Sequence, residues 1–319
     1  MSEPHPFADW IAADWGTSHL RLWAMGPGGA VLERACSDAG MGRIARADYE
    51  AELLRLIGHR LAPGRATPVI VCGMAGSRQG WAEAPYALAP CPPPGIAEAA
   101  RAAARDARLA VSILPGVRQT RPQADVMRGE ETQIAGLLAR LPSFDGTVCL
   151  PGTHTKWVQV SAGEIVSFTT AMTGELFSLL STRSVLCHSL GGEDWDASAF
   201  AEALAETLAR PERLATRLFT IRAEALTVGL PPAAGRARLS GLLIGTELAA
   251  TRPWWLGRRV AIIGAAKLSR IYSEALAAQG VDAERFDDEE MTLAGLARAR
   301  QMLTEKVTCA ATSSPSSAA

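Results

Sequence analysis

The sequence has few lysines and no hydrophobic run long enough to cross a membrane. Only Lys156, Lys267 and Lys306 are present among its 319 residues, so arginine carries most of the positive charge. The formal net charge is −1, and without a basic excess we do not expect nucleic-acid binding. No hydrophobic run approaches the roughly 20 residues that span a bilayer. The start of the chain also lacks the pattern of a secretory signal peptide, and we expect a cytoplasmic protein.

The six cysteines lack the spacing of a zinc site or of a disulfide framework. No two of them form a CxxC pair, and the five histidines are scattered. Cys72 and Cys149 lie in hydrophobic runs, where cysteine usually packs as a small hydrophobic residue. The chain also lacks the GxxxxGKS/T, GxGxxG and GxSxG patterns. A P-loop, a dinucleotide fingerprint and a hydrolase nucleophile elbow are therefore not expected.

A pattern of strands and turns occurs twice in the chain. GTSHLRL begins at Gly16, and the similar GTHTKWV begins at Gly152, 136 residues later. Each lies in a predicted meander of three short strands that is followed by alternating helices and strands. We therefore expect two α/β lobes. The predicted helices cover 47–61, 95–107, 129–141, 174–188, 196–208, 211–225 and about 236–250, and after a strand-loop-helix at 258–280 a last helix covers about 288–303.

Each of the two turns between strands suits a phosphate group. Glycine lets a ligand approach the main chain, and the N–H groups of such a turn converge on one small concavity. An acid just before the first turn, Asp14, would hold a hydrated Mg²⁺. An ordinary hairpin explains one such turn equally well, but the repeat favours a shared function. The candidate nucleotide-binding residues are Asp14, Gly16, Thr17 and Ser18 in the first turn and Gly152, Thr153, His154, Thr155 and Lys156 in the second. His154 could contact phosphate as a neutral donor, but a role in shaping the loop is favoured.

A cluster of charged residues lies at a predicted loop-to-helix junction, in DVMRGEETQ. A carboxylate there, Glu130 or Asp125, could accept a proton from an attacking hydroxyl. The alternative is that the acids only favour the start of a helix. Arg128, Arg78 or Arg118 could pair with a substrate carboxylate.

Two further loops are candidates for binding a ligand. GMAGSRQGW follows a buried strand, and its Ser77, Arg78, Gln79 and Trp81 could contact a polar substrate, with Trp81 stacked on a sugar face. A plain surface loop is the alternative. AIIGAAKLSRIY is a strand, a small-residue loop and a helix, and the loop at Gly264 and Ala265 leaves room for an adenosine. Generic packing of a helix on a strand is the alternative there.

Several blocks together resemble the 2-dehydro-3-deoxygalactonokinases of the sugar kinase/Hsp70/actin superfamily. They are DWGTSHLRLW, GMAGSRQGW, DVMRGEETQIAGLL, PGTHTKW, TTAMTGELFSLLSTRSVL and LSGLLIGTEL, and the resemblance covers about residues 9–303. It implies two ribonuclease-H-like (actin-like ATPase) α/β domains flanking an interlobe cleft. It also implies a cytoplasmic, ATP- and Mg²⁺-dependent kinase that phosphorylates the 6-hydroxyl of 2-dehydro-3-deoxy-D-galactonate in galactonate catabolism.

The resemblance also assigns roles to the blocks. DWGTS resembles the first phosphate loop, with Asp14 as the metal-associated acid, and PGTHTKW resembles the second. IIGAAKL stands where the adenosine loop should be and departs from its usual glycine-rich form. RGEETQ resembles the glutamate segment of exopolyphosphatase relatives, which favours Glu130 as the base with Asp125 behind it. The expected division is 1–143 for the sugar-acid lobe, 144–304 for the adenosine lobe and 305–319 for a disordered tail.

Other functions fit the same residues. The chain could phosphorylate the epimeric 2-dehydro-3-deoxygluconate, because no side chain visibly distinguishes the epimers. Water could replace the sugar in a polyphosphate or nucleotide hydrolase of the same fold. A sensor that binds the sugar acid without catalysis is a third alternative, and the sequence leaves open whether the chain forms a homodimer.

Overall fold

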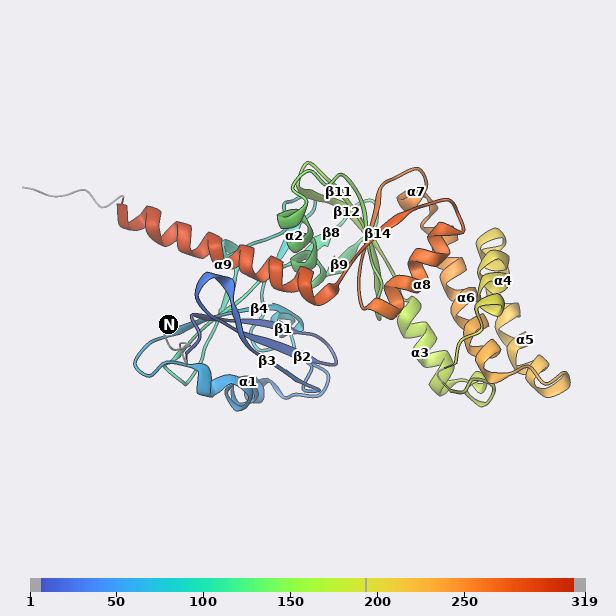
Figure 1. Cartoon of the computed structure of the whole chain (residues 1–319), viewed down its shortest axis with the longest axis horizontal. Coiled ribbons are helices and arrows are strands. Elements are labelled where there is room, and N and C mark those ends of the chain that lie inside the picture. Colours follow the sequence, from blue (N-terminus) through green and yellow to red (C-terminus); the bar gives the residue numbers. More distant parts are fainter. Residues whose placement is uncertain (1–6, 193, 313–319) are drawn as a thin grey trace, which may run out of the picture. The chain divides into compact units, whose positions relative to one another are not determined.

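The chain forms two compact units, which we describe one at a time (Figure 1). The computed structural model describes residues 7–192 and 194–312, with side chains to Leu303. Within these residues, the first unit comprises the chain up to Phe144, Ala162–Val166 and the chain from Asp288 onward. The second unit comprises Asp145–Ser161 and Ser167–Asp287.

The last helix corrects the expected division of the chain. Helix α9 (Asp288–Thr312) belongs to the first unit, although residues 288–304 were expected in the second lobe. Its Leu296 and Ala299 pack with Ile70 and Cys72 of the first sheet. The order of elements along a sequence does not reveal which sheet a terminal helix covers. The backbone is helical through Thr312, so the predicted disordered tail is wrong for 305–312, and residues 313–319 lie outside the described residues.

The first unit is built on a mixed sheet of six strands in the order β3-β2-β1-β4-β7-β6. The first three strands along the chain pair antiparallel, and β4 and β7 run parallel to β1. A small second sheet has the order β5-β8-β9. The strands are β1 (Trp10–Trp15), β2 (Leu20–Met25), β3 (Val31–Ser37), β4 (Thr67–Gly73), β5 (Tyr86–Leu88), β6 (Ala100–Ala102), β7 (Leu109–Ile113), β8 (Gly116–Gln119) and β9 (Asp125–Met127).

Helices cover both faces of the large sheet in the first unit. Helix α1 (Tyr49–Ile57) buries Tyr49, Leu53 and Ile57 against one face, because these side chains recur at helical spacing. Helix α2 (Glu130–Arg140) packs along α9, and the two ribbons lie side by side in Figure 1. A Cβ added at Gly136 would lie 1.9 Å from the carbonyl oxygen of Met291, so only glycine permits this close crossing.

The helix predicted over 95–107 is wrong. This segment contains a short turn and then strand β6, which pairs antiparallel with β7 at the edge of the sheet. Alanine favours helix, but the intrinsic preference is under about 1 kcal/mol per residue, and pairing with a neighbouring strand overrides it. The other predicted helices are confirmed within about five residues of their expected bounds, except the last one, which was predicted to end near 303 and continues to Thr312.

The second unit repeats the strand order of the first. Its sheet is β12-β11-β10-β13-β14, in which β10 and β11 form an antiparallel hairpin and β13 and β14 run parallel to β10. Numbered within its own sheet, the second unit has the order 3-2-1-4-5, which is the ribonuclease-H-like arrangement. The first unit has the same arrangement with β7 in the fifth place and β6 added antiparallel at the edge. The expected fold class is confirmed. The strands are β10 (Gly146–Leu150), β11 (Thr155–Ser161), β12 (Glu164–Ala171), β13 (Val260–Ile263) and β14 (Ala283–Phe286).

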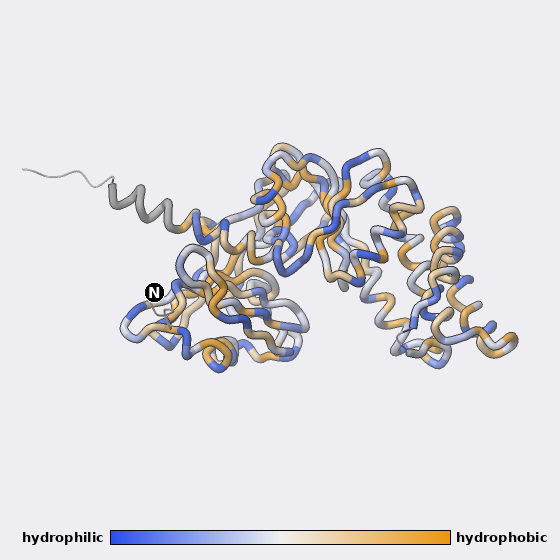
Figure 2. Tube along the Cα trace, in the orientation of Figure 1, coloured by the Kyte–Doolittle hydropathy of each residue, from blue (hydrophilic) through white to orange (hydrophobic). Residues whose placement is uncertain are grey.

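Helices α4, α6 and α8 pack against this sheet, and α3, α4 and α5 pack on α6. Because α6 has neighbours on several sides, it is buried along most of its length. In Figure 2, α4 and α5 alternate hydrophobic and hydrophilic stretches. No helix among the described residues is long and hydrophobic enough to cross a membrane. The helices are α3 (Thr173–Arg183), α4 (Ala197–Ala209), α5 (Leu214–Thr227), α6 (Pro232–Ala250), α7 (Arg252–Trp255) and α8 (Ala266–Ala277).

Candidate functional site

The tip between β10 and β11, residues 151–154, lies against the start of α3. The N–H of Glu175 donates to the carbonyl oxygen of Thr153 over 2.9 Å. A Cβ added at Gly174 would lie 2.2 Å from the carbonyl oxygen of Gly152, so glycine is required where the helix meets the tip. A Cβ added at Gly152 would meet nothing within 4 Å. The tip therefore presents open main chain beside a helix N-terminus, an arrangement that favours anions.

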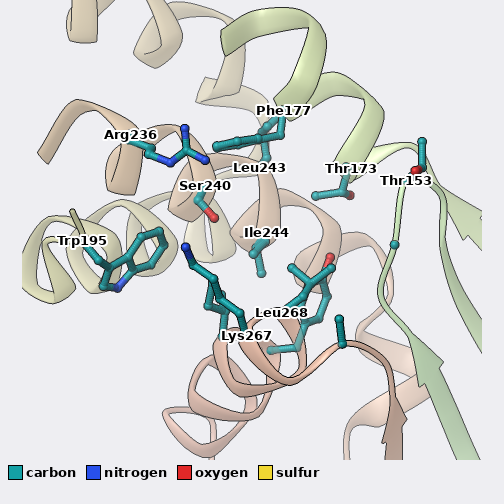
Figure 3. Close-up of a pocket in the computed structure, with 15 residues that line it drawn as sticks. Thr153, Thr173, Phe177, Trp195, Arg236, Ser240, Leu243, Ile244, Lys267 and Leu268 are labelled. Atoms are coloured by element: carbon teal, nitrogen blue, oxygen red, sulfur yellow. The ribbon is translucent and has the colours of Figure 1, made fainter. Parts of the chain in front are cut away.

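A cavity of about 450 Å³ adjoins this tip, entirely within the second unit. In Figure 3, Thr153 and Thr173 lie at one end, and Trp195, Arg236 and Lys267 lie at the other. Hydrophobic side chains fill the middle. A polar end beside an open tip and a hydrophobic middle suit the phosphates and the base of a nucleotide, respectively. The lining residues are Gly152, Thr153, Thr173, Gly174, Phe177, Trp195, Arg236, Ser240, Leu243, Ile244, Ala265, Lys267, Leu268, Ile271 and Tyr272.

The far end of the cavity contains features that the sequence did not single out. The guanidinium carbon of Arg236 lies 5.2 Å from the ring centre of Phe177, within cation–π range. Trp195 and Lys267 lie on the same side (Figure 3). Helices α3, α6 and α8 and the segment before α4 supply these residues. No single sequence motif contains these residues, because they come from four segments that are far apart along the chain.

The predicted adenosine loop lies at this cavity. Ala265 is among the lining residues, and Gly264 precedes it in the turn from β13 to α8. The N–H of Gly264 donates to the carbonyl oxygen of Phe286, which fixes the turn to the neighbouring strand. The small residues therefore leave space here as expected, although the role of the loop stays a prediction.

Three residues of the second turn do not line the cavity. His154 lies 2.6 Å from a carboxylate oxygen of Glu175, a contact that ties the tip to α3. Thr155 is buried. The ammonium of Lys156 donates to the hydroxyl of Thr170 over 2.9 Å. Because side chains alternate along β11, Lys156 and Thr155 point to opposite faces of the sheet. Whether Lys156 adds a charge to the phosphate site stays a prediction.

The tip between β1 and β2 in the first unit has the same exposed character. Thr17 and Ser18 are exposed, and within the described residues their backbone N–H groups donate to no protein acceptor. The N–H of Met41 donates to the carbonyl oxygen of Gly16, and Gly40 packs directly on Ser18. The tip is thus fixed from one side and leaves its N–H groups available to a ligand.

Asp14 lies in a chain of ion pairs. Its Oδ2 accepts from Nε and Nη2 of Arg21 over 3.0 and 2.6 Å, and Nη1 of Arg21 donates to Asp288 over 2.7 Å. These carboxylates raise the pKa of Arg21 although its burial opposes the shift. No group of three or more His, Cys, Asp or Glu side chains in the described part of the chain is arranged to hold a metal. A metal at Asp14 would therefore rely on water or a ligand for its other contacts.

Two acids fold back over the loop that precedes α2. The N–H of Arg128 donates to Glu130 over 3.0 Å, and the N–H of Gly129 donates to both oxygens of Glu131 over 2.8 Å. Gly129 has φ +112°, and Gly73 at the end of β4 has φ +85°, so both positions require glycine. A Cβ at Gly129 would lie 3.4 Å from the Cα of Gly73.

The same contacts bring this loop close to Asp14. A Cβ added at Gly73 would lie 3.4 Å from Oδ1 of Asp14. The structure therefore gathers Asp14, Glu130 and Glu131 around two glycines, as the ends of neighbouring strands permit. Glu131 is 1% exposed and faces inward, whereas Glu130 is partly exposed and accessible to a substrate.

Glu131 is a buried acid that makes stability depend on pH. Burial raises the pKa of Glu131 from 4.5 to about 8, and the neighbouring Glu130 adds to the rise. The folded chain keeps this proton up to about pH 8, whereas the unfolded chain loses it near pH 4.5. The contribution of Glu131 to the free energy of unfolding is therefore fully present below about pH 4.5 and is lost as the pH rises to about 8.

We expect the free energy of unfolding to fall between about pH 5 and 8, by up to about 1.4 kcal/mol per pH unit from this group. Glu131→Gln should remove that slope, because glutamine still accepts from the N–H of Gly129 and does not titrate. Urea denaturation at several pH values measures the free energy of unfolding of the wild-type chain and of the variant. An unchanged slope in the variant would assign the pH dependence to other groups.

Arg128 is a buried guanidinium without a complete set of partners. It is 9% exposed; its Nη2 donates to the carbonyl oxygen of Ala84 over 2.8 Å, and its plane lies 4.1 Å over the ring of Tyr86. Within the described residues its Nη1 is buried without a hydrogen-bond partner, and so is the hydroxyl of Ser77. Nη1 would lie 2.7 Å from a Cβ at Gly76, the residue before Ser77. A buried cation with an unsatisfied N–H group suits a carboxylate.

The other predicted substrate residues have different places in the first unit. Arg78 and Gln79 are exposed, and Arg78 lies 3.8 Å from Glu83. Asp125 begins β9 and accepts from the N–H of Val126. Trp81 is 8% exposed and packs in an aromatic cluster with Trp15 and Tyr49, so its expected role as a sugar-stacking residue is corrected.

The duplicated strand order, the two glycine-threonine tips and a cavity suited to a nucleotide define a protein of the actin-like ATPase class. Comparison with known families narrows this class. The chain belongs to the 2-keto-3-deoxy-galactonokinase family, whose model matches residues 14–299. It is an enzyme of the kinase type that acts on a sugar acid.

Two similar proteins and one crystal structure agree with this family. A probable 2-dehydro-3-deoxygalactonokinase of Rhizobium meliloti (strain 1021) is 39% identical over 299 residues, which cover 92% of this chain and 97% of that protein. The 2-dehydro-3-deoxygalactonokinase of Escherichia coli (strain K12) is 34% identical, with 91% and 96% covered. A crystal structure of a Sinorhizobium meliloti protein assigned the same activity has a TM-score of 0.85 at 38% identity, with 92% and 96% covered.

Proposed function

We propose that the chain transfers the γ-phosphoryl group of ATP to the 6-hydroxyl of 2-dehydro-3-deoxy-D-galactonate in galactonate catabolism. The family and the similar proteins support a kinase for this sugar acid. The single observation that carries the substrate class is Arg128, whose buried Nη1 has no hydrogen-bond partner within the described residues. A substrate carboxylate would satisfy this group.

ATP would bind in the cavity of the second unit. Its phosphates would lie at the end with Thr153 and Thr173, and its base would lie among Leu243, Ile244 and Leu268. Mg²⁺ would arrive with the nucleotide as part of the substrate. Arg21 donates to Oδ2 of Asp14, and Oδ1, which also accepts from the thiol of Cys72 over 3.7 Å, would accept from a water of the hydrated ion. The first tip, with Gly16, Thr17 and Ser18, stays a predicted phosphate contact.

The chemistry follows from the placement of one carboxylate. The oxygen of the sugar hydroxyl attacks the γ-phosphorus, and the bond from that phosphorus to the β-bridging oxygen breaks. Glu130 accepts the hydroxyl proton, and ADP leaves. Asp125 remains the alternative base. The protein forms no covalent bond with the phosphoryl group in such a transfer. Positioning of the reactants and stabilisation of charge therefore supply most of the rate enhancement.

The test is a coupled assay that measures ADP release over a panel of keto-deoxy sugar acids, with and without Mg²⁺. We expect turnover with 2-dehydro-3-deoxygalactonate that requires Mg²⁺ and exceeds turnover with the gluconate-derived epimer. Faster turnover of the epimer would correct the substrate. ADP release without any sugar acid would favour a hydrolase, and tight sugar-acid binding without ADP release would favour a sensor. Cytoplasmic location and homodimer formation stay predictions.

A further inference from the structure

A second buried acid lies beneath the cavity of the second unit, and the proposed chemistry does not use it. Glu247 on α6 is 5% exposed and is not among the residues that line the cavity. Burial raises the pKa of Glu247 above its ordinary value, while hydrogen bonds from Thr173, Trp157, Tyr272 and Thr155 oppose the shift. Burying a carboxyl is costly unless hydrogen bonds satisfy it, and here several donors converge on one side chain.

The donors to Glu247 come from three different elements. Nε1 of Trp157 on β11 donates to Oε1 over 2.8 Å, and the hydroxyl of Tyr272 on α8 donates to Oε2 over 2.8 Å. The hydroxyl of Thr173, the first residue of α3, also donates to Oε2. Thr155 on β11 lies 3.1 Å from the hydroxyl of Tyr272 and extends the network. One side chain of α6 thus joins the strand after the tip to two helices that border the cavity.

This network leads directly to the polar end of the cavity. Thr173 and Tyr272 both line the cavity, and in Figure 3 Thr173 lies near Thr153. Thr173 begins the helical turn whose Glu175 N–H donates to the carbonyl oxygen of Thr153. The position of the tip therefore depends on the first turn of α3, and that turn is anchored through Thr173 to Glu247.

We propose that Glu247 is a positioning residue that holds the start of α3 and the tip at Gly152 and Thr153 in place to receive the nucleotide phosphates. This inference rests on the proposed nucleotide site in the cavity. Glu247 touches no substrate; it acts through the hydroxyls of Thr173 and Tyr272. A carboxylate suits the task because it only accepts hydrogen bonds and meets only donors here.

The main test is Glu247→Gln. The glutamine has the same shape, but its amide replaces one acceptor with a donor, so one of the present contacts must be lost or reversed. We expect the dissociation constant of a non-hydrolysable ATP analogue and the KM for ATP to rise about tenfold, since small displacements of binding groups have effects of this size or larger. The KM for the sugar acid should stay within twofold.

The matched control is Trp157→Phe. This variant removes one donor to the same carboxylate, but from a buried residue that does not line the cavity. It should lower the thermal midpoint while leaving nucleotide affinity within twofold. If Glu247→Gln binds the analogue as tightly as the wild-type chain, or if Trp157→Phe weakens binding equally, the positioning role is wrong.

A second pair of variants separates positioning from direct contact. Thr173→Val removes the hydroxyl, and Thr173→Ser retains it and should restore nucleotide binding. If Thr173 acts through Glu247, the double variant Glu247→Gln, Thr173→Val should bind no more weakly than the weaker single variant. Additive losses would show that Thr173 contacts the nucleotide by itself and would overturn the proposed route. This pair also serves if Glu247→Gln fails to fold.

Gly152→Val separates this inference from the proposed site. A Cβ there meets no atom within 4 Å, so the fold should be retained, but the valine side chain would occupy the open face of the tip. Weakened nucleotide binding in this variant supports the cavity as the nucleotide site. If Gly152→Val weakens binding and Glu247→Gln does not, only the role of Glu247 fails. Unchanged binding in Gly152→Val would overturn the site itself, and the inference with it.

Discussion

Glu130→Gln is expected to lower kcat by about a thousandfold and to leave the affinity for ATP within twofold. A positioned general base contributes roughly 10² to 10⁴ in rate, and the amide of glutamine cannot accept the hydroxyl proton. Glu130 is partly exposed at the start of α2, and the N–H of Arg128 donates to it over 3.0 Å. Glutamine retains that acceptor, so the loop should keep its shape. Initial-rate kinetics and calorimetric titration of an ATP analogue measure the two effects.

Glu131→Gln provides the control for this variant. It changes the adjacent residue in the same way, but Glu131 faces inward and is 1% exposed. Its kcat should stay within a few-fold of the wild-type value. Asp125→Asn tests the alternative base. Full turnover by Glu130→Gln would exclude Glu130 from the chemistry, and loss of turnover only in Asp125→Asn would assign the proton to Asp125.

Arg128→Lys is expected to raise the KM for the sugar acid by about a hundredfold, with the affinity for ATP unchanged. Lysine retains the charge but loses the planar fork that binds a carboxylate through two nitrogens. Charge-assisted hydrogen bonds contribute about 1.5–3 kcal/mol, which corresponds to roughly 10- to 100-fold in affinity. Steady-state kinetics with the sugar acid varied at saturating ATP would measure this loss.

Two comparisons show whether the loss concerns the carboxylate. An analogue that bears a neutral amide in place of the carboxylate should bind weakly to the wild-type chain and to Arg128→Lys alike, because the contact is absent in both. Arg118→Lys is the matched protein control, since Arg118 is an exposed arginine on β8, next to β9 in the small sheet. If Arg118→Lys raises the KM for the sugar acid equally, the carboxylate does not bind at Arg128 in particular. If Arg128→Lys still binds the sugar acid more tightly than its amide analogue, the carboxylate binds elsewhere.

The repeated hairpins could be predicted from the sequence because their signals are local. Alternating residues around Gly16 and Gly152 define strands and turns within a dozen positions, and the same order recurs in both sheets. The place of α9 could not be predicted in this way. Its contacts with Ile70 and Cys72 join residues more than 200 positions apart, and no local pattern encodes such a pairing.

For the candidate site, the sequence predicted the types of residue that are present better than it predicted how they are arranged. DVMRGEETQ indicated acids and an arginine at a loop, but which acid faces inward depends on the turn at Gly129, whose φ is +112°. Trp81 was misassigned because the burial of a side chain cannot be inferred from a short aromatic stretch.

The close crossing of α2 and α9 has a consequence for biosynthesis. Gly136 meets the backbone of Met291, and Gly295 meets that of Thr132 at a comparable distance. The N-terminal unit is therefore incomplete until the final helix has left the ribosome, although nearly all of its strands are made first. Leu296 and Ala299 cannot cover Ile70 and Cys72 until the entire second unit has been synthesised.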